Sequence, residues 1–151
     1  MKFTKRELFA LTAGSAAALT GLSALAPVAA KTTDLDDAIS KFAGGKAVKE
    51  GRVSLTTPEI AENGNTVPVS VDVESPMTDA DHVSEVLLLA DGNPRPGVAK
   101  FKFTPMSGEA SATTRIRLAK TQNVVAVAKM SDGSVFMAKS LVKVTIGGCG
   151  G

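Results

Sequence analysis

Apolar and polar residues alternate along most of the chain after residue 50, a pattern typical of strands that bury one face and expose the other. The clearest run is 67–73, where valines occupy every second position. Turn-forming sequences separate the runs, and Asp132-Gly133 has the spacing of a tight hairpin. The alternation predicts about seven strands, the most regular of them at 67–73, 100–103, 115–118 and 125–127, and the last one or two at 135–146.

Two segments depart from this alternation. In 34–43 the apolar residues recur at helical spacing, acidic residues lie at the start, and Gly44-Gly45 follows as a stop, so we expect a short helix. The apolar run in 82–90 fits either a helix or a central strand, and we predict a strand because its neighbours can pair with it. The expected fold class is therefore all-β, an antiparallel immunoglobulin-like sandwich with a short N-terminal helix, with a closed barrel as the alternative.

Residues 1–30 have the features of an export signal. Three basic residues begin it, a mildly hydrophobic stretch follows, and small residues at 27–30 provide a cleavage site. Lys5-Arg6 resembles a twin-arginine signal with lysine in the first position, so both twin-arginine and Sec export are open. A retained membrane anchor is the alternative to cleavage. We expect three parts in the chain: the signal at 1–30, one domain at 31–146 and a C-terminal arm at 147–151.

Charge and composition exclude several classes of partner. The chain has 17 basic and 15 acidic residues, and the signal contains three and one of these, which leaves 14 of each in the mature protein. The remaining charges are interspersed, and tryptophan and tyrosine are absent, so neither a basic run nor an aromatic platform for nucleic acid is present. We expect no nucleic-acid partner and no membrane association after the signal is removed.

The sequence lacks the residue sets of common catalytic sites. His82 is the single histidine, so a zinc site or a catalytic triad would lack its usual members. Asp79, Asp81 and Glu85 could form at most a weak metal site with it, and a solvated loop histidine is the simpler interpretation. We therefore expect no metal, no cofactor and no enzymatic activity, and interpret the domain as a carrier or binding module.

Cys149 is the single cysteine, and it is surrounded by four glycines at the end of the chain. Glycines free the backbone, so we expect a flexible arm formed by Gly147, Gly148, Gly150 and Gly151. A thiolate is a strong nucleophile that can carry a covalently bound group. Three residues beyond Ile146 extend the sulfur by about 10 Å, enough to enter a narrow active site. A lone cysteine could also form an intermolecular disulfide.

The tail Gly147–Gly151, together with the segments Ile60–Val69 and Ser75–Met77, resembles the SoxY family. Members of this family are the sulfur-carrier subunits of the periplasmic thiosulfate-oxidising Sox system. The resemblance covers essentially the whole chain, including the export signal. It implies a periplasmic location and assigns Cys149 as the covalent attachment point of the sulfur substrate.

The same resemblance implies a heterodimer with SoxZ, a second immunoglobulin-like chain, and transient contacts with three enzymes. The cytochrome pair SoxXA couples thiosulfate oxidatively to the thiol, and SoxB hydrolyses the terminal sulfonate to sulfate. In many members SoxCD then oxidises the remaining sulfane sulfur. The intermediates stay on the arm throughout, so other proteins supply all of the chemistry.

Two functions of other classes also fit parts of the sequence. One is an exported structural or adhesion sandwich in which Cys149 only cross-links chains. The other is a cytoplasmic sulfur carrier or ubiquitin-like modifier that uses the carboxylate of a terminal Gly-Gly. The signal, the strand-rich pattern and the adjacent thiol all oppose the second of these.

Overall fold

The computed structural model describes residues 34–148 of the chain, so the predicted signal at 1–30 and Cys149 lie outside the described residues. The described residues all belong to one compact unit. Within residues 34–148, no helix is long and apolar enough to cross a membrane.

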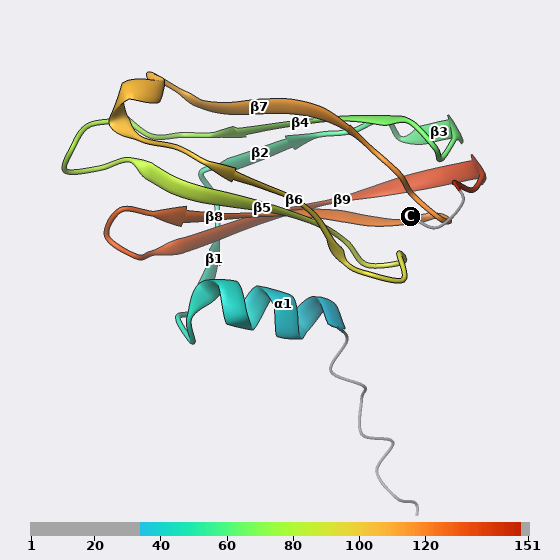
Figure 1. Cartoon of the computed structure of the whole chain (residues 1–151), viewed down its shortest axis with the longest axis horizontal. Coiled ribbons are helices and arrows are strands. Elements are labelled where there is room, and N and C mark those ends of the chain that lie inside the picture. The colour runs from blue at the N-terminus through green and yellow to red at the C-terminus, as the bar shows by residue number, and fades with distance from the viewer. Residues whose placement is uncertain (1–33, 149–151) are drawn as a thin grey trace, which may run out of the picture. The chain divides into compact units, whose positions relative to one another are not determined.

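Strands make up most of the described chain, and one α-helix precedes them (Figure 1). A 3-10 turn, Pro105–Ser107, lies between two of the strands. The elements are α1 (Asp34–Ala43), β1 (Val48–Glu50), β2 (Val53–Thr56), β3 (Ile60–Asn63), β4 (Val67–Val73), β5 (Val83–Ala90), β6 (Gly97–Lys102), β7 (Ala110–Ile116), β8 (Gln122–Met130) and β9 (Val135–Ile146).

The strands form two sheets that pack face to face, which confirms the predicted all-β sandwich. The larger sheet has the order β1-β9-β8-β5-β6, with β3 also paired to β9, and the smaller sheet has the order β2-β4-β7. Residues 34–148 contain nine strands rather than about seven, and β1 and β3 pair with β9 in parallel, so the sandwich is not purely antiparallel. Strands of three and four residues carry too little alternation to be recognised in the sequence.

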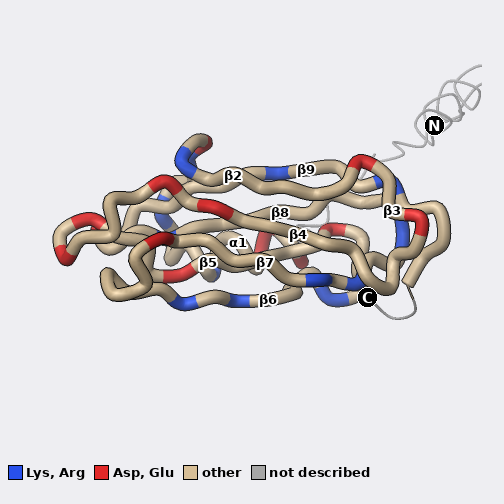
Figure 2. The backbone as a smooth tube through the Cα atoms, turned by 90° about the horizontal axis from the view of Figure 1, so that it is seen from above, with Lys and Arg blue, Asp and Glu red and all other residues tan. Residues whose placement is uncertain are grey.

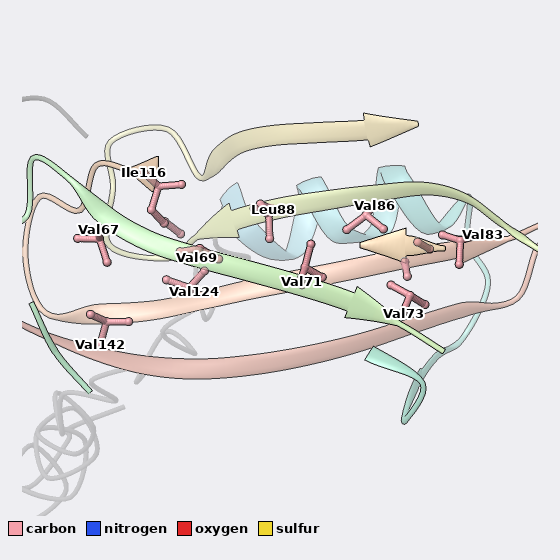
Figure 3. Close-up of a cluster of buried hydrophobic side chains, with 14 of the residues drawn as sticks. Val67, Val69, Val71, Val73, Val83, Val86, Leu88, Ile116, Val124 and Val142 are labelled. Atoms are coloured by element: carbon pink, nitrogen blue, oxygen red, sulfur yellow. The ribbon is translucent and has the colours of Figure 1, made fainter. Parts of the chain in front are cut away.

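The core between the sheets is built from the alternating positions. The four valines of β4 are at most 6% exposed and point toward the larger sheet, as Figure 3 shows. Two strands of the larger sheet are buried on both faces, because α1 covers the face that the smaller sheet leaves open. In β8, Val124 contributes to the core between the sheets and Val125 to the cluster under the helix. This double burial explains the continuous apolar run of β5 and confirms the strand predicted at 82–90.

Helix α1 is held on the larger sheet by Leu35 and Phe42, which are both buried. The ammonium groups of Lys129 and Lys100 lie 4.7 and 5.6 Å from the centroid of the Phe42 ring, within the range of cation–π attraction. Gly44 and Gly45, with φ of 62° and 79°, end the helix as the sequence predicted.

The predicted hairpin at Asp132-Gly133 joins β8 to β9, and its turn contains a carboxyl group with a shifted pKa. The Asp132 Oδ1 accepts hydrogen bonds from the Ser134 hydroxyl at 2.6 Å and from the Ser134 amide at 2.7 Å. These two bonds hold the pKa of Asp132 below its ordinary value of 3.8, and the bond from the Ser134 hydroxyl has the larger effect.

We expect Ser134→Ala to move the pKa of Asp132 back toward 3.8, because it removes the stronger of the two hydrogen bonds. The folded-state pKa lies below the unfolded value, so the ionised carboxylate stabilises the hairpin above the unfolded pKa. That contribution is lost as the pH falls through the lower folded-state value. NMR titration of the Asp132 carboxyl in both proteins measures the change, and identical titration curves would contradict the assigned cause.

Candidate functional site

Strand β9 carries the chain from the β8–β9 hairpin to the opposite end of the sandwich, where the cysteine-containing tail begins. Its 12 residues span about 40 Å at 3.3 Å per residue. The first part pairs with β8, up to Val142, and the last part pairs with β3, from Lys143 to Ile146. Figure 1 shows the end of β9 beside β3, far from the hairpin.

Beyond β9, two loops hold Gly147 and Gly148 against the body of the domain. The Gly64 amide, in the β3–β4 turn, donates to the Ile146 carbonyl at 2.7 Å, and the Gly64 carbonyl accepts from the Leu118 amide at 2.8 Å. The Gly148 amide donates in turn to the Leu118 carbonyl at 2.9 Å. The three hydrogen bonds link the tail, the β3–β4 turn and the β7–β8 loop, and they satisfy both backbone groups of the buried Gly64 and the amide of the buried Gly148.

Glycine is required at three of these positions because backbone approaches backbone very closely. A Cβ on Gly64 would lie 2.3 Å from the Leu118 oxygen and 2.7 Å from the Gly148 nitrogen. A Cβ on Gly147 would lie 2.2 Å from the Ala119 oxygen, and one on Gly148 would lie 2.7 Å from the Gly64 oxygen. None of the three glycines has a positive φ, so close approach and not unusual backbone conformation selects glycine here. We call this set the tail clamp: Gly64, Leu118, Ala119, Ile146, Gly147 and Gly148.

A buried polar network fixes the β7–β8 loop that forms one side of the tail clamp. Gln122, only 4% exposed, accepts from the Gly92 amide at 2.7 Å and donates to Asn93 Oδ1 at 2.9 Å and to the Lys120 carbonyl at 3.0 Å. Asn93 accepts from the Ala119 amide at 3.0 Å and donates to the Arg117 carbonyl at 2.9 Å. Hydrogen bonds to the residues just before and just after Leu118 therefore fix the loop that carries it.

Charged residues of both signs lie around the tail clamp. Arg115 at the end of β7 and Arg117 and Lys120 in the loop after it are exposed, as is Glu62 of β3. Figure 2 shows basic segments near the end of β7 and an acidic segment at β3, on the same end of the molecule. The tail therefore leaves from a surface of mixed charge.

The residues predicted from the sequence to form the functional site fall into two groups. Cys149, Gly150 and Gly151 lie outside the described residues, so the attachment role of Cys149 stays a prediction. Gly147 and Gly148 were expected to belong to a free arm, and the structure instead places them in the tail clamp. The flexibility of the arm stays a prediction.

The weak metal site considered around His82 is not formed by the described residues. The His82 Nδ1 lies 2.9 Å from the Thr78 carbonyl oxygen, as expected for a histidine that stabilises its own loop. Among residues 34–148, no three histidine, cysteine, aspartate or glutamate side chains are grouped so that they could hold a metal ion.

Comparison with known proteins identifies the family. A protein-family model for the sulfur oxidation protein SoxY matches residues 39–149. The chain belongs to the SoxY family. The matched region includes nearly all of the described domain and extends to Cys149. SoxY proteins are sulfur carrier subunits and not enzymes, and this chain shares that role.

A solved SoxY structure agrees with this family. The sulfur carrier protein SoxY from Chlorobium limicola f thiosulfatophilum is 33% identical to the chain, with a TM-score of 0.64 and coverage of 75% of this chain and 93% of that one. No match is found among curated proteins.

Superoxide reductases have a similar fold at lower identity. A superoxide reductase (neelaredoxin) from Ignicoccus hospitalis is 21% identical over 68% of this chain and 89% of its own, with a TM-score of 0.56. A putative superoxide reductase from Thermotoga maritima is 20% identical over 68% and 89%, with a TM-score of 0.53. At this level of identity the likeness shows the fold alone.

The tail clamp and its supporting network are features that the sequence did not predict. Gly64 lies within the Ile60–Val69 segment that resembles SoxY, where Asn63-Gly64-Asn65 is a turn-forming sequence, and that pattern alone does not indicate a docked tail. Leu118 and Ala119 contribute backbone atoms, which leave no trace in the pattern of side chains. Asn93 and Gln122 look like ordinary polar residues until the fold brings them together.

Proposed function

We propose that this SoxY protein holds thiosulfate-derived sulfur covalently on Cys149 and presents it to partner enzymes in the periplasm. The observation that carries the proposal is that the family match extends to residue 149, the only cysteine of the chain. The geometry of the domain supports it, since β9 delivers the tail to one end of the sandwich, where the Cys149 thiol can meet a partner.

The proposed chemistry begins with the formation of a disulfide bond between the Cys149 Sγ and the sulfane sulfur of thiosulfate. The thiol loses its proton, and two electrons pass to a cytochrome, SoxXA by family resemblance. In the active site of SoxB, water then attacks the terminal sulfonate sulfur, and the bond between the two substrate sulfurs breaks. Sulfate is released, and the remaining sulfur stays on Cys149 as a persulfide. SoxCD is proposed to oxidise that remaining sulfur in the next step.

The proposal includes a stable heterodimer with SoxZ and export directed by residues 1–30. SoxZ partners generally lack a signal of their own, so export of the folded pair through the twin-arginine route would bring both chains to the same compartment. The Lys5-Arg6 pair makes this route testable, since Lys5→Arg restores the twin arginine.

Intact mass spectrometry of the protein from thiosulfate-grown cells tests the carrier function. We expect one subunit with added mass of a thiosulfate group or of one or more sulfur atoms, and we expect reductant to remove it. Protein whose thiol is alkylated before exposure to thiosulfate and SoxXA serves as the control and should gain no sulfur. A disulfide-linked dimer with no sulfur adduct would instead support the structural or adhesion sandwich.

A further inference from the structure

We propose that Gly64 is a positioning residue for the carrier thiol: it closes the tail clamp, and the clamp must open before Cys149 can reach a deep active site. The inference deepens the proposed function and rests on it, because it concerns how the tail presents the thiol. Gly64 belongs to the body of the domain, 84 residues before Gly148 in the sequence, and a tail that was merely flexible would not depend on it.

The closed clamp limits the reach of the thiol. With Gly148 buried and hydrogen-bonded to Leu118, the chain is held one residue before Cys149, so the fixed point lies about 3.5 Å of extended chain from that residue. When the clamp opens, the fixed point moves back to Ile146 and three residues extend from it, which gives about 10 Å. Opening therefore converts a short tether into one that can enter a narrow site.

The cost of opening is small enough to allow both states. Opening breaks the hydrogen bond between Gly148 and Leu118, and a hydrogen bond of this kind favours the closed state by about 5-fold. The close packing of glycine backbones adds dispersion contacts that favour the closed state further. A partner that binds only the open tail must overcome the combined preference for the closed state. Its apparent affinity for the carrier falls by the factor by which the closed state is favoured over the open one.

Gly64→Ala is the cleanest test, because it leaves the tail chemically unchanged. The new Cβ would meet the Leu118 oxygen and the Gly148 nitrogen, and both are backbone atoms that no side-chain rotation can move away. We expect the Gly148 amide to exchange with solvent about 10-fold faster in the full-length variant than in the wild type, measured by NMR. A nitroxide spin label on Cys149, the only thiol, should also become more mobile.

Gly97→Ala is the matched control. Gly97 lies on β6, has no positive φ and has no atom within 4 Å of an added Cβ, so the same substitution should leave Gly148 exchange and label mobility unchanged. Amide exchange of Val71 and Val124 in the core reports whether Gly64→Ala has damaged the fold. If the fold is damaged, the Gly148→Ala variant is used in place of Gly64→Ala. A Cβ on residue 148 would meet the Gly64 oxygen from the other side of the clamp.

The double variant Gly64→Ala/Gly148→Ala tests whether the two glycines act in one clamp. Each single change is expected to open it, so the spin label in the double variant should be no more mobile than in the more mobile single variant. Additive effects would show that the two glycines act independently and would contradict the clamp.

Presentation of the thiol is tested with the sulfur-loaded carrier and SoxB. We expect Gly64→Ala to lower the KM for the carrier by up to about 10-fold with kcat unchanged, because opening is no longer required before binding. Unchanged Gly148 exchange in Gly64→Ala, with the core intact, would overturn the proposal, and so would faster exchange with an unchanged or higher KM. If Cys149 cannot be loaded at all, the proposed function fails, while amide exchange and label mobility still decide the clamp.

Discussion

Cys149→Ser is expected to abolish thiosulfate oxidation by the reconstituted Sox system. The serine hydroxyl cannot form the sulfur–sulfur bond that links the substrate to the carrier, and the chain has no second thiol that could replace it. The loss should therefore be complete, in contrast to the partial losses that follow from weakened binding. Sulfate release and intact mass measure it, and the variant should show neither thiosulfate turnover nor a sulfur adduct.

The same variant should fold and bind SoxZ as the wild type does, because residue 149 follows every strand of the sandwich. Thr145→Ser is the matched control, since it changes an exposed side chain on β9 just before the tail and keeps the thiol. It should retain full turnover. Thiosulfate oxidation by Cys149→Ser at the rate of Thr145→Ser would refute the carrier role of Cys149.

Leu88→Ala is expected to lower the free energy of unfolding by about 3 kcal/mol, within a range of roughly 2 to 5 kcal/mol. Leu88 is fully buried in β5 and belongs to the core between the two sheets. The substitution removes apolar surface that the fold had buried and leaves a cavity that neighbouring strands cannot fill. Urea denaturation measures the loss as a lower midpoint with an unchanged slope.

Leu141→Ala provides the matched control for this stability prediction. Leu141 lies on β9 and is 52% exposed, so the same change of side chain should cost less than about 0.5 kcal/mol. Equal losses in the two variants would show that Leu88 does not lie in the core as described.

The tail clamp changes the explanation for the glycines beside the cysteine. The sequence suggested that all four provide freedom of movement. In the structure, Gly147 and Gly148 have ordinary backbone conformations and are packed against Ala119 and Gly64, where any side chain would collide. Glycine at these two positions permits docking, and the same absence of side chains also suits entry into a narrow channel.

The sequence predicted the long elements well because each has a periodic pattern of its own. The alternating valines of β4, the helical spacing of α1 and the turn at Asp132-Gly133 all appear in the structure as expected. β5 was predicted as a strand from its neighbours, because burial on both faces removes the alternation that would mark it. β1 and β3 were missed as separate strands, and their parallel pairing with β9 joins segments more than 80 residues apart.

The sequence by itself determined the fold class, the family and the residue expected to carry sulfur. Each of these depends on side chains read along one stretch of chain: alternating apolar residues, and a lone thiol among glycines. Only the tertiary structure decided where the tail docks. The hydrogen bonds of the tail clamp join backbone atoms of Gly64, Leu118, Ile146 and Gly148, and nearly every residue carries the same backbone groups, so only folding can show which of them meet.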